Sequence, residues 1–139
     1  MKSGETAEPI KWKFSYRLDG RTYVSDKRIL LDQRYVLVRP LPERGEMSPE
    51  TIREHLSRPE QIRFSADDLK QSFFGNWEAP DRWLLHKRYV AFLRSLPLSK
   101  ALNFGLVIGK PRAVLIYDGD LLIGFTAVPT FEREIDVTS

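Results

Sequence analysis

The feature that most limits how this chain can fold is a strict alternation of apolar and polar residues near its N-terminus. The apolar positions are Ile10, Trp12, Phe14, Tyr16 and Leu18. A period of two is that of a β-strand with one buried and one solvated face. Asp19-Gly20 follows directly, and both residue types accept the positive φ of a two-residue hairpin turn. The pattern therefore predicts a hairpin whose return strand covers residues 21–28 and pairs Tyr16 with Tyr23 on the inner face.

A second Asp-Gly pair predicts another hairpin in the last third of the sequence. The dipeptide at 118–119 separates two apolar segments, residues 112–117 and 120–128. A two-residue turn at this dipeptide sets Val114 against Ile123. Both faces of this hairpin are apolar, which is typical of strands that are covered on both sides. We therefore expect it at the centre of the sheet, with the first hairpin further out.

Signals for helix starts fill the segment between the hairpins. Ser48-Pro49 places an oxygen-bearing cap before a proline, and Ser65 with Asp68 has the spacing of a capping box. The other elements expected are a strand over 34–39, helices over 48–58, 65–74 and 80–96, a further helical turn over 99–104 and an edge strand over 131–137. Strands at both ends with helices between them favour an α+β fold. We predict an antiparallel sheet of five or six strands, built from an N-terminal and a C-terminal hairpin, with a block of about three helices packed on one face.

Length and composition limit the class of protein. The 139 residues match one domain, so we expect a disordered tail over residues 1–9 and a single α+β domain over residues 10–139. The sequence contains no cysteine, which excludes disulfides, thiolate zinc sites, iron–sulfur clusters and cysteine nucleophiles. The first nine residues lack the basic and apolar segments of a signal peptide, and the longest nearly uncharged stretch, 101–108, is too short to span a bilayer. The expectation is a cytoplasmic protein with no membrane partner.

Catalytic motifs are scarce, and His86 is the one weak candidate for a catalytic residue. It lies on the flank of the apolar stripe of the predicted helix 80–96, where it could act as a general base with Asp81 or Glu78 beside it. A histidine at such a boundary is more often held by a structural hydrogen bond. His55 and His86 lack metal-ligand spacing, and no phosphate loop, dinucleotide fingerprint or nucleophile elbow occurs. We expect no metal and no cofactor, and an enzyme is less favoured than a binding protein.

Basic residues give the first candidate binding surface. The sequence has 22 basic and 19 acidic residues, a net charge of +3. The residues expected to bind nucleic acid or another anion are Lys11, Lys13, Arg17, Arg28, Lys87, Arg88, Arg94, Lys110 and Arg112. In the predicted hairpin Lys13 opposes Asp26. Lys11 opposes Arg28, a like-charge pair that costs stability unless an anion lies over it. Such residues suit a nucleic-acid backbone or an acidic protein surface, and a merely solvated face is the plain alternative.

Large aromatic residues give a second candidate surface. Those expected to bind a partner are Phe73, Phe74, Trp77 and Trp83, because such residues dominate interface hot spots. Their structural alternative is a hydrophobic plug that fixes a loop to the core. The favoured function is a non-enzymatic binding or regulatory protein, such as a subunit, inhibitor or adaptor, that docks on a macromolecular partner, in the first place a protein. The alternatives are a nucleic-acid-binding protein that uses the basic hairpin and helix surface, and a small enzyme that uses His86.

Overall fold

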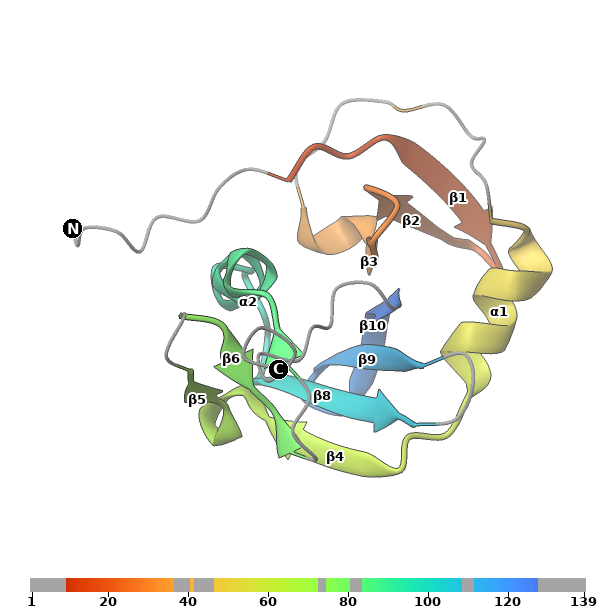
Figure 1. Ribbon diagram of the computed structural model, residues 1–139. Helices are drawn as coiled ribbons and strands as arrows, with labels where there is room; N and C mark the ends of the chain where they lie inside the picture. Colours follow the sequence, from red (N-terminus) through yellow and green to blue (C-terminus); the bar gives the residue numbers. More distant parts are fainter. Residues whose placement is uncertain are drawn as a thin grey trace, which may run out of the picture.

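The computed structural model describes residues 10–36, 41, 47–72, 75–80, 84–108 and 112–127. These residues form a seven-stranded antiparallel sheet, a small three-stranded sheet and two α-helices (Figure 1). The strands of the large sheet, in spatial order, are β1 (Phe14–Leu18), β2 (Arg21–Ser25), β3 (Ile29–Asp32), β10 (Leu121–Ala127), β9 (Ala113–Asp118), β8 (Leu102–Val107) and β4 (Ile62–Ser65). The predicted α+β class is confirmed, with more strands and fewer helices than predicted.

The two α-helices lie on opposite sides of the large sheet (Figure 1). The remaining elements are α1 (Pro49–Ser57), α2 (Lys87–Arg94), β5 (Lys70–Gln71), β6 (Trp77–Glu78), β7 (Leu84–Leu85) and two 3₁₀ turns, η1 (Gln33–Tyr35) and η2 (Ala66–Asp68). Ile52 of α1 belongs to one hydrophobic core, and Val90 and Leu93 of α2 belong to the other. The prediction that all helices pack on one face is wrong because β9 is buried along its whole length, so both faces need a cover.

The first hairpin is confirmed in its turn and its register. Asp19 and Gly20 have φ values of 51° and 82°, and Tyr16 faces Tyr23. The ladder ends earlier than predicted, at Phe14 and Ser25. There the N–H of Lys13 also donates to the carbonyl of Ser25, at 2.8 Å, so two residues of the first strand oppose one residue of the second.

The chain leaves the hairpin at Asp26. Its carboxylate accepts the N–H groups of Arg28 and Ile29, at 2.8 and 2.9 Å, which closes a tight turn into β3. The predicted cross-strand pairs of Lys13 with Asp26 and of Lys11 with Arg28 are therefore not formed. The second of these was the like-charge pair on which the predicted anion site depended.

The second hairpin lies at the centre of the sheet, as predicted, but the predicted register of its strands is wrong. Asp118 pairs with Leu121, so the turn residues are Gly119, with φ 66°, and Asp120. The register shifts again between Leu122 and Gly124, and Val114 faces Thr126 rather than Ile123. Asp118 stays in the strand because its carboxylate is held by three buried hydrogen bonds, which the local sequence does not reveal.

The elements between the hairpins follow the predictions in part. Helix α1 is confirmed, and the Ser48 side chain accepts the N–H of Thr51. The predicted strand over 34–39 is replaced by β3 and η1 over residues 29–35, and positions 37–39 lie outside the described residues. The predicted turn of helix over 99–104 is wrong, because Leu102 begins β8. The predicted strand over 131–137 lies outside the part of the chain that the structure describes.

Two of the predicted helices are shorter than expected and adjoin short strands. The capping box of Ser65 and Asp68 is present, yet it starts only the 3₁₀ turn η2, after which the chain enters β5. Helix α2 begins at Lys87 rather than near residue 80, because Leu84 and Leu85 pair with β6. Among the described residues, no helix is long and apolar enough to cross a bilayer.

Candidate anion-binding site

An open depression lies where the β2–β3 ladder splits. The last pair of this ladder is Tyr23 with Asp32, and the same register would next place Arg34 opposite Arg21. Instead the chain turns into η1 and the two segments separate. The depression has a volume of about 480 Å³ and is lined by Gly20, Arg21, Thr22, Asp32, Gln33 and Arg34. We call it the arginine pocket.

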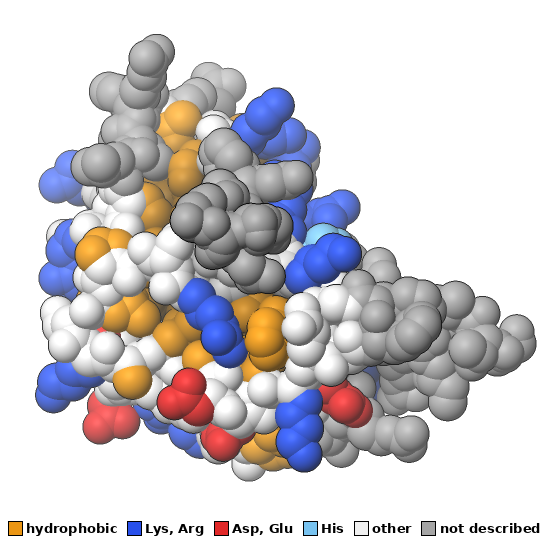
Figure 2. All heavy atoms as spheres, turned by 90° about the vertical axis from the view of Figure 1, so that its left-hand side faces the viewer, with side chains coloured by type: hydrophobic (Ala, Val, Ile, Leu, Met, Phe, Trp, Pro, Cys, Tyr) orange, Lys and Arg blue, Asp and Glu red, His pale blue; other side chains and the backbone are white. Residues whose placement is uncertain are grey.

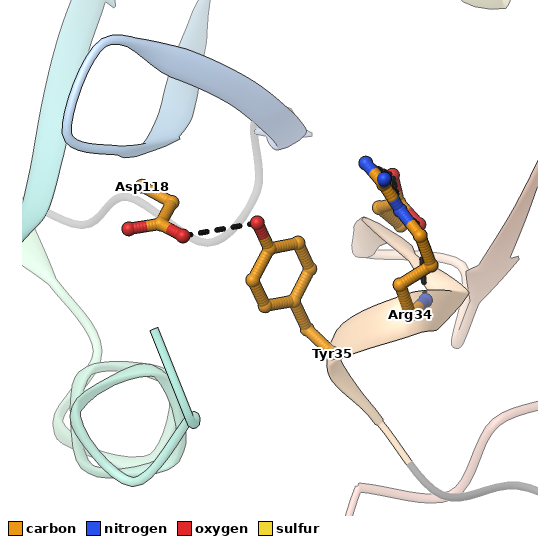
Figure 3. Close-up of polar contacts among 4 residues, drawn as sticks. Arg34, Tyr35 and Asp118 are labelled. Atoms are coloured by element: carbon orange, nitrogen blue, oxygen red, sulfur yellow. Dashed lines mark hydrogen bonds and ion pairs between the residues drawn. The ribbon is translucent and has the colours of Figure 1, made fainter. Parts of the chain in front are cut away.

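One wall of the arginine pocket is a fixed arginine. The Asp32 side chain is 1% exposed, and its carboxylate accepts the backbone N–H of Arg34 at 3.0 Å, which caps η1. It also accepts the Nε–H of Arg34, at 3.1 Å, and Nη2–H, at 2.8 Å (Figure 3). These hydrogen bonds raise the pKa of the Arg34 guanidinium, so the group keeps its charge. A side-on pair of this kind fixes both the position and the plane of the guanidinium.

Arg34 nevertheless keeps donors for another molecule. A guanidinium has five N–H groups, and Asp32 takes only the edge formed by Nε and Nη2. No other residue of the described chain accepts a hydrogen bond from this side chain, which is 60% exposed. The end of the fork formed by Nη1 and Nη2 is therefore open to solvent.

The turn that carries Arg34 is also anchored from its other side. The Tyr35 hydroxyl donates to the carboxylate of Asp118 at 3.0 Å (Figure 3). Asp118 also accepts the backbone N–H groups of Ser99 and Lys100, at 3.0 and 2.8 Å. Burial alone would raise the pKa of Asp118, but these hydrogen bonds lower it overall, so the carboxylate stays charged. Two buried acids, one on each side, thus hold a turn of three residues in place.

The charge of the pocket comes from two guanidinium groups and one carboxylate, which leave a single net positive charge. Tyr23 lies beside them and adds no charge at neutral pH, because burial raises the pKa of its phenol. The positive charge of Arg21 opposes that shift, and the negative charge of Asp32 adds to it. Two arginines that face one open space repel each other, and a bound anion relieves this repulsion.

None of the predicted anion-binding residues is among the residues that line the pocket, but Arg17 faces one of them. It pairs with Thr22 across the hairpin, so the two side chains share a face of the sheet. Lys11, Lys13 and Arg28 are exposed near the opposite end of the hairpin and do not line the depression. The predicted solvated face is also interrupted, because Ser15 is 8% exposed and Val24 is fully buried.

Three of the other predicted basic residues belong to α2. Lys87 and Arg88 open α2, Arg94 ends it, Arg112 precedes β9, and Lys110 lies outside the described residues. On the face that Figure 2 shows, Lys and Arg side chains lie mainly along the margins, with hydrophobic and a few acidic side chains between them. Arg88 of α2 nevertheless lies near Arg28 of the first hairpin segment, because the charges of both oppose the rise that burial causes in the pKa of Tyr89, whose hydroxyl donates to Asp26 at 2.9 Å.

Of the four residues of the predicted aromatic surface, the structure describes only Trp77. Trp77 is half-buried and packs against the core on the α2 side. The guanidinium of Arg94 covers its ring, with 4.5 Å to the ring centroid, and also donates to the carbonyl of Ala66 at 3.1 Å. Trp77 thus has a structural role in joining α2 to the small sheet. Phe73, Phe74 and Trp83 lie outside the described residues.

His86 is placed as a helix cap. Its Nδ1 accepts the backbone N–H of Arg88 at 3.1 Å, and the ring is exposed at the first turn of α2. The prediction that it lies on the flank of a longer helix is wrong, because α2 begins one residue later. Glu78 lies on β6, and Asp81 is outside the described residues. Within the described ranges no three acidic or histidine side chains are grouped as metal ligands.

The three charged residues of the pocket were missed by sequence reasoning. A local signal existed for Asp32, which follows the apolar run Ile29–Leu31 and stands two residues before Arg34. An aspartate at this spacing commonly accepts the N–H two residues ahead and starts a turn. No local signal places Arg21 and Arg34 around one depression, because this depends on the register of β3.

No protein-family model, curated protein or solved structure matches this chain.

Proposed function

We propose that this protein is a non-enzymatic binding protein that docks on an anionic region of a macromolecular partner through the arginine pocket. The observation that supports this most directly is the pair of arginines at the split of β2 and β3. One of them, Arg34, is fixed by a buried carboxylate and keeps open donors. A donor group that is already oriented loses little freedom when a ligand binds, which favours recognition.

The chemistry of the lining supports binding rather than catalysis. Guanidinium groups remain protonated in proteins, so Arg21 and Arg34 are hydrogen-bond donors and not general acids or bases at neutral pH. Thr22 and Gln33 add a hydroxyl and an amide. The one carboxylate, Asp32, is occupied by Arg34. Such a set of groups holds an oxyanion and leaves it unchanged.

The proposal is tested by comparing three proteins as baits in extracts of the native host. Arg34→Gln removes the fixed guanidinium. Arg53→Gln is the matched control, because Arg53 is similarly exposed, at 50%, and pairs with Asp19 at the tip of the same hairpin. Both variants lose one positive charge. We expect a partner that the wild-type protein and Arg53→Gln retain and that Arg34→Gln loses, with unchanged circular dichroism spectra for all three proteins.

Two results would contradict the proposal. The first is equal retention of every partner by the wild-type protein and Arg34→Gln. The second is equal loss from both variants, which would point to net charge rather than to the pocket. Nuclease treatment of the extract identifies the alternative function, because a partner held through nucleic acid is then released from the wild-type protein as well.

A further inference from the structure

We infer that the arginine pocket is a carboxylate site, which takes one carboxylate of an acidic protein segment, either from an Asp or Glu side chain or from a chain end. This inference rests on the proposed function and names the chemical group that the pocket recognises. Four features of the pocket carry it: its net charge, the geometry of its open donors, its rigidity and its lining.

The net charge matches an anion with a single negative charge. Arg21 and Arg34 carry two positive charges, and Asp32 neutralises one of them. A carboxylate or a phosphodiester therefore leaves the occupied pocket neutral. A phosphate monoester, which carries close to two negative charges at neutral pH, leaves an excess negative charge beside the buried Asp32. The pocket thus favours a singly charged oxyanion.

The open donors of Arg34 match a planar, two-oxygen acceptor. Its Nε–Nη2 edge already holds one carboxylate, Asp32, with Nε donating to Oδ1 at 3.2 Å and Nη2 donating to Oδ2 at 2.8 Å. The remaining Nη1 and Nη2 hydrogens form a second fork of the same kind, which suits a second carboxylate in the guanidinium plane. Arg21 approaches the depression from β2, and Thr22 and Gln33 can donate to the lone pairs that stay unused.

The part of the pocket that would contact the anion, the Arg34 side chain and its turn, is held in place. Arg34 is fixed by Asp32, and the turn below it is tied through Tyr35 to the buried Asp118. A single carboxylate offers only two oxygens, so its affinity depends on donors that are ordered beforehand.

The lining favours a protein over a nucleic acid as the source of the anion. Single-stranded nucleic acid is held by exposed aromatic rings that stack on bases as well as by cations. None of the lining residues is aromatic. The large hydrophobic residue that is exposed in the described chain is Leu121, at 41%, which cannot stack with a base. A phosphodiester strand would therefore lose most of its contacts beyond the pocket.

The inference is tested with labelled peptides by fluorescence anisotropy at constant ionic strength. The probes are an end-blocked peptide with several Glu residues, the same peptide with Gln in their place, an uncharged peptide with a free C-terminal carboxylate, and an oligo-dT strand. We expect the Glu peptide to bind about tenfold or more tightly than the Gln peptide, because hydrogen bonds to charged groups are worth that factor. The free-ended peptide shows whether a chain end is accepted as well.

Variants assign the binding to the pocket. Arg34→Gln and Arg34→Lys are both expected to weaken the Glu peptide by about tenfold or more, since lysine carries the charge but lacks the fork. Arg53→Gln is expected to stay within about twofold of the wild-type protein. Circular dichroism confirms that each variant is folded, and Arg21→Gln gives a second, independent removal of a pocket donor.

Three outcomes overturn the inference. The first is tighter binding of oligo-dT than of the Glu peptide. The second is undiminished binding of the Glu peptide by Arg34→Lys, and the third is no binding of either carboxylate peptide at millimolar concentration. None of these outcomes contradicts the proposed function as long as Arg34→Gln still loses a partner from the host extract. Conversely, retention of all partners by Arg34→Gln contradicts the proposed function even if an isolated carboxylate binds.

Discussion

Arg63 and Arg34 both lie beside a carboxylate in this molecule, but only Arg63 also packs over an aromatic ring of the described chain. Arg63 of β4 lies over the ring of Tyr117, with 3.7 Å from its central carbon to the ring centroid. Its Nη2 donates to the carbonyl of Gly119 at 2.7 Å and to Asp120 at 3.2 Å. Its side chain is 33% exposed, against 60% for Arg34.

The difference lies in what each arginine rests on. Arg63 packs flat on an aromatic ring that is itself fixed, because the Tyr117 hydroxyl donates to Glu60 at 2.8 Å. Arg34 is held at one edge by Asp32 and has no ring beneath it in the described chain. We propose that an arginine packed on a ring stabilises the fold, whereas one that is held by a single edge and is more exposed can serve a ligand.

The largest expected effect concerns the ring beneath Arg63. Tyr117 is 7% exposed, so Tyr117→Ala removes a buried aromatic side chain and the support of Arg63. We expect it to lower the free energy of unfolding by about 3–5 kcal/mol. Tyr35→Ala, on the pocket side, should cost less because Tyr35 is only half-buried. Denaturant unfolding measures both, and equal losses would break the comparison, since the two tyrosines would then support the fold alike.

A smaller effect is expected at one glycine in the neighbourhood of each arginine. Gly105 pairs with Arg63, and an added Cβ would lie 2.8 Å from the Glu60 Cβ and 3.2 Å from the ring of Tyr117. Gly105→Ala should therefore cost about 1–3 kcal/mol through overpacking. Gly20 lines the pocket and has open space around it, but its φ is 82°. Gly20→Ala should cost only about 1 kcal/mol, from the backbone conformation alone.

Thermal unfolding of the two alanine variants checks this order. If Gly20→Ala is the more damaging change, the pocket is as tightly packed as the Arg63 cluster, and the contrast between the two regions disappears.

A further prediction concerns a buried histidine, whose titration makes the stability of the folded protein depend on pH. His55 of α1 is 8% exposed and stacks on Phe125, with 4.6 Å between ring centroids. Its Nδ1 is buried and has no hydrogen-bond partner within the described chain. Burial lowers the pKa of His55, the charge of Arg58 lowers it further, and Glu54 opposes this. The ring is therefore neutral in the folded protein at neutral pH.

The sign of the pH dependence follows from this shift. Below the ordinary histidine pKa of about 6.5, the unfolded chain binds a proton that the folded chain does not. Stability is thus complete above that pH and falls as the pH drops toward the lower folded pKa, with a slope of at most about 1.4 kcal/mol per pH unit. His55→Phe keeps the stack and should remove this slope between about pH 7.5 and 5.5. An unchanged slope in this variant would assign the effect to other groups.

The parts of the fold that the sequence predicts well are those with local causes. Asp19-Gly20 forms its turn because both residues accept positive φ, and α1 begins at Pro49 because Ser48 caps it. The second turn is displaced by one residue because Asp118 is needed elsewhere. Its buried bonds to Ser99, Lys100 and Tyr35 come from segments that are distant in sequence.

The same distinction between local and distant causes applies to the residues of the site. The pairing of Arg17 with Thr22, which lines the pocket, follows from the hairpin, because its own turn sets the register. The Arg21–Arg34 juxtaposition was missed because it depends on how β3 pairs with β2, and residues 34–39 had been predicted as a strand. The expected like-charge pair of Lys11 with Arg28 does not form, because the ladder ends at Phe14 and Ser25.

The smallest expected effect is the most direct test of the contrast between Arg63 and Arg34. A ligand present at its dissociation constant stabilises a protein by about 0.4 kcal/mol. We therefore expect acetate to raise the melting temperature slightly, relative to chloride at the same ionic strength, in the wild-type protein and in Arg63→Gln. Arg34→Gln should lose this increment. General salt effects act on all three proteins and cancel in the difference, so equal increments would mean that Arg34 offers a carboxylate no more than Arg63 does.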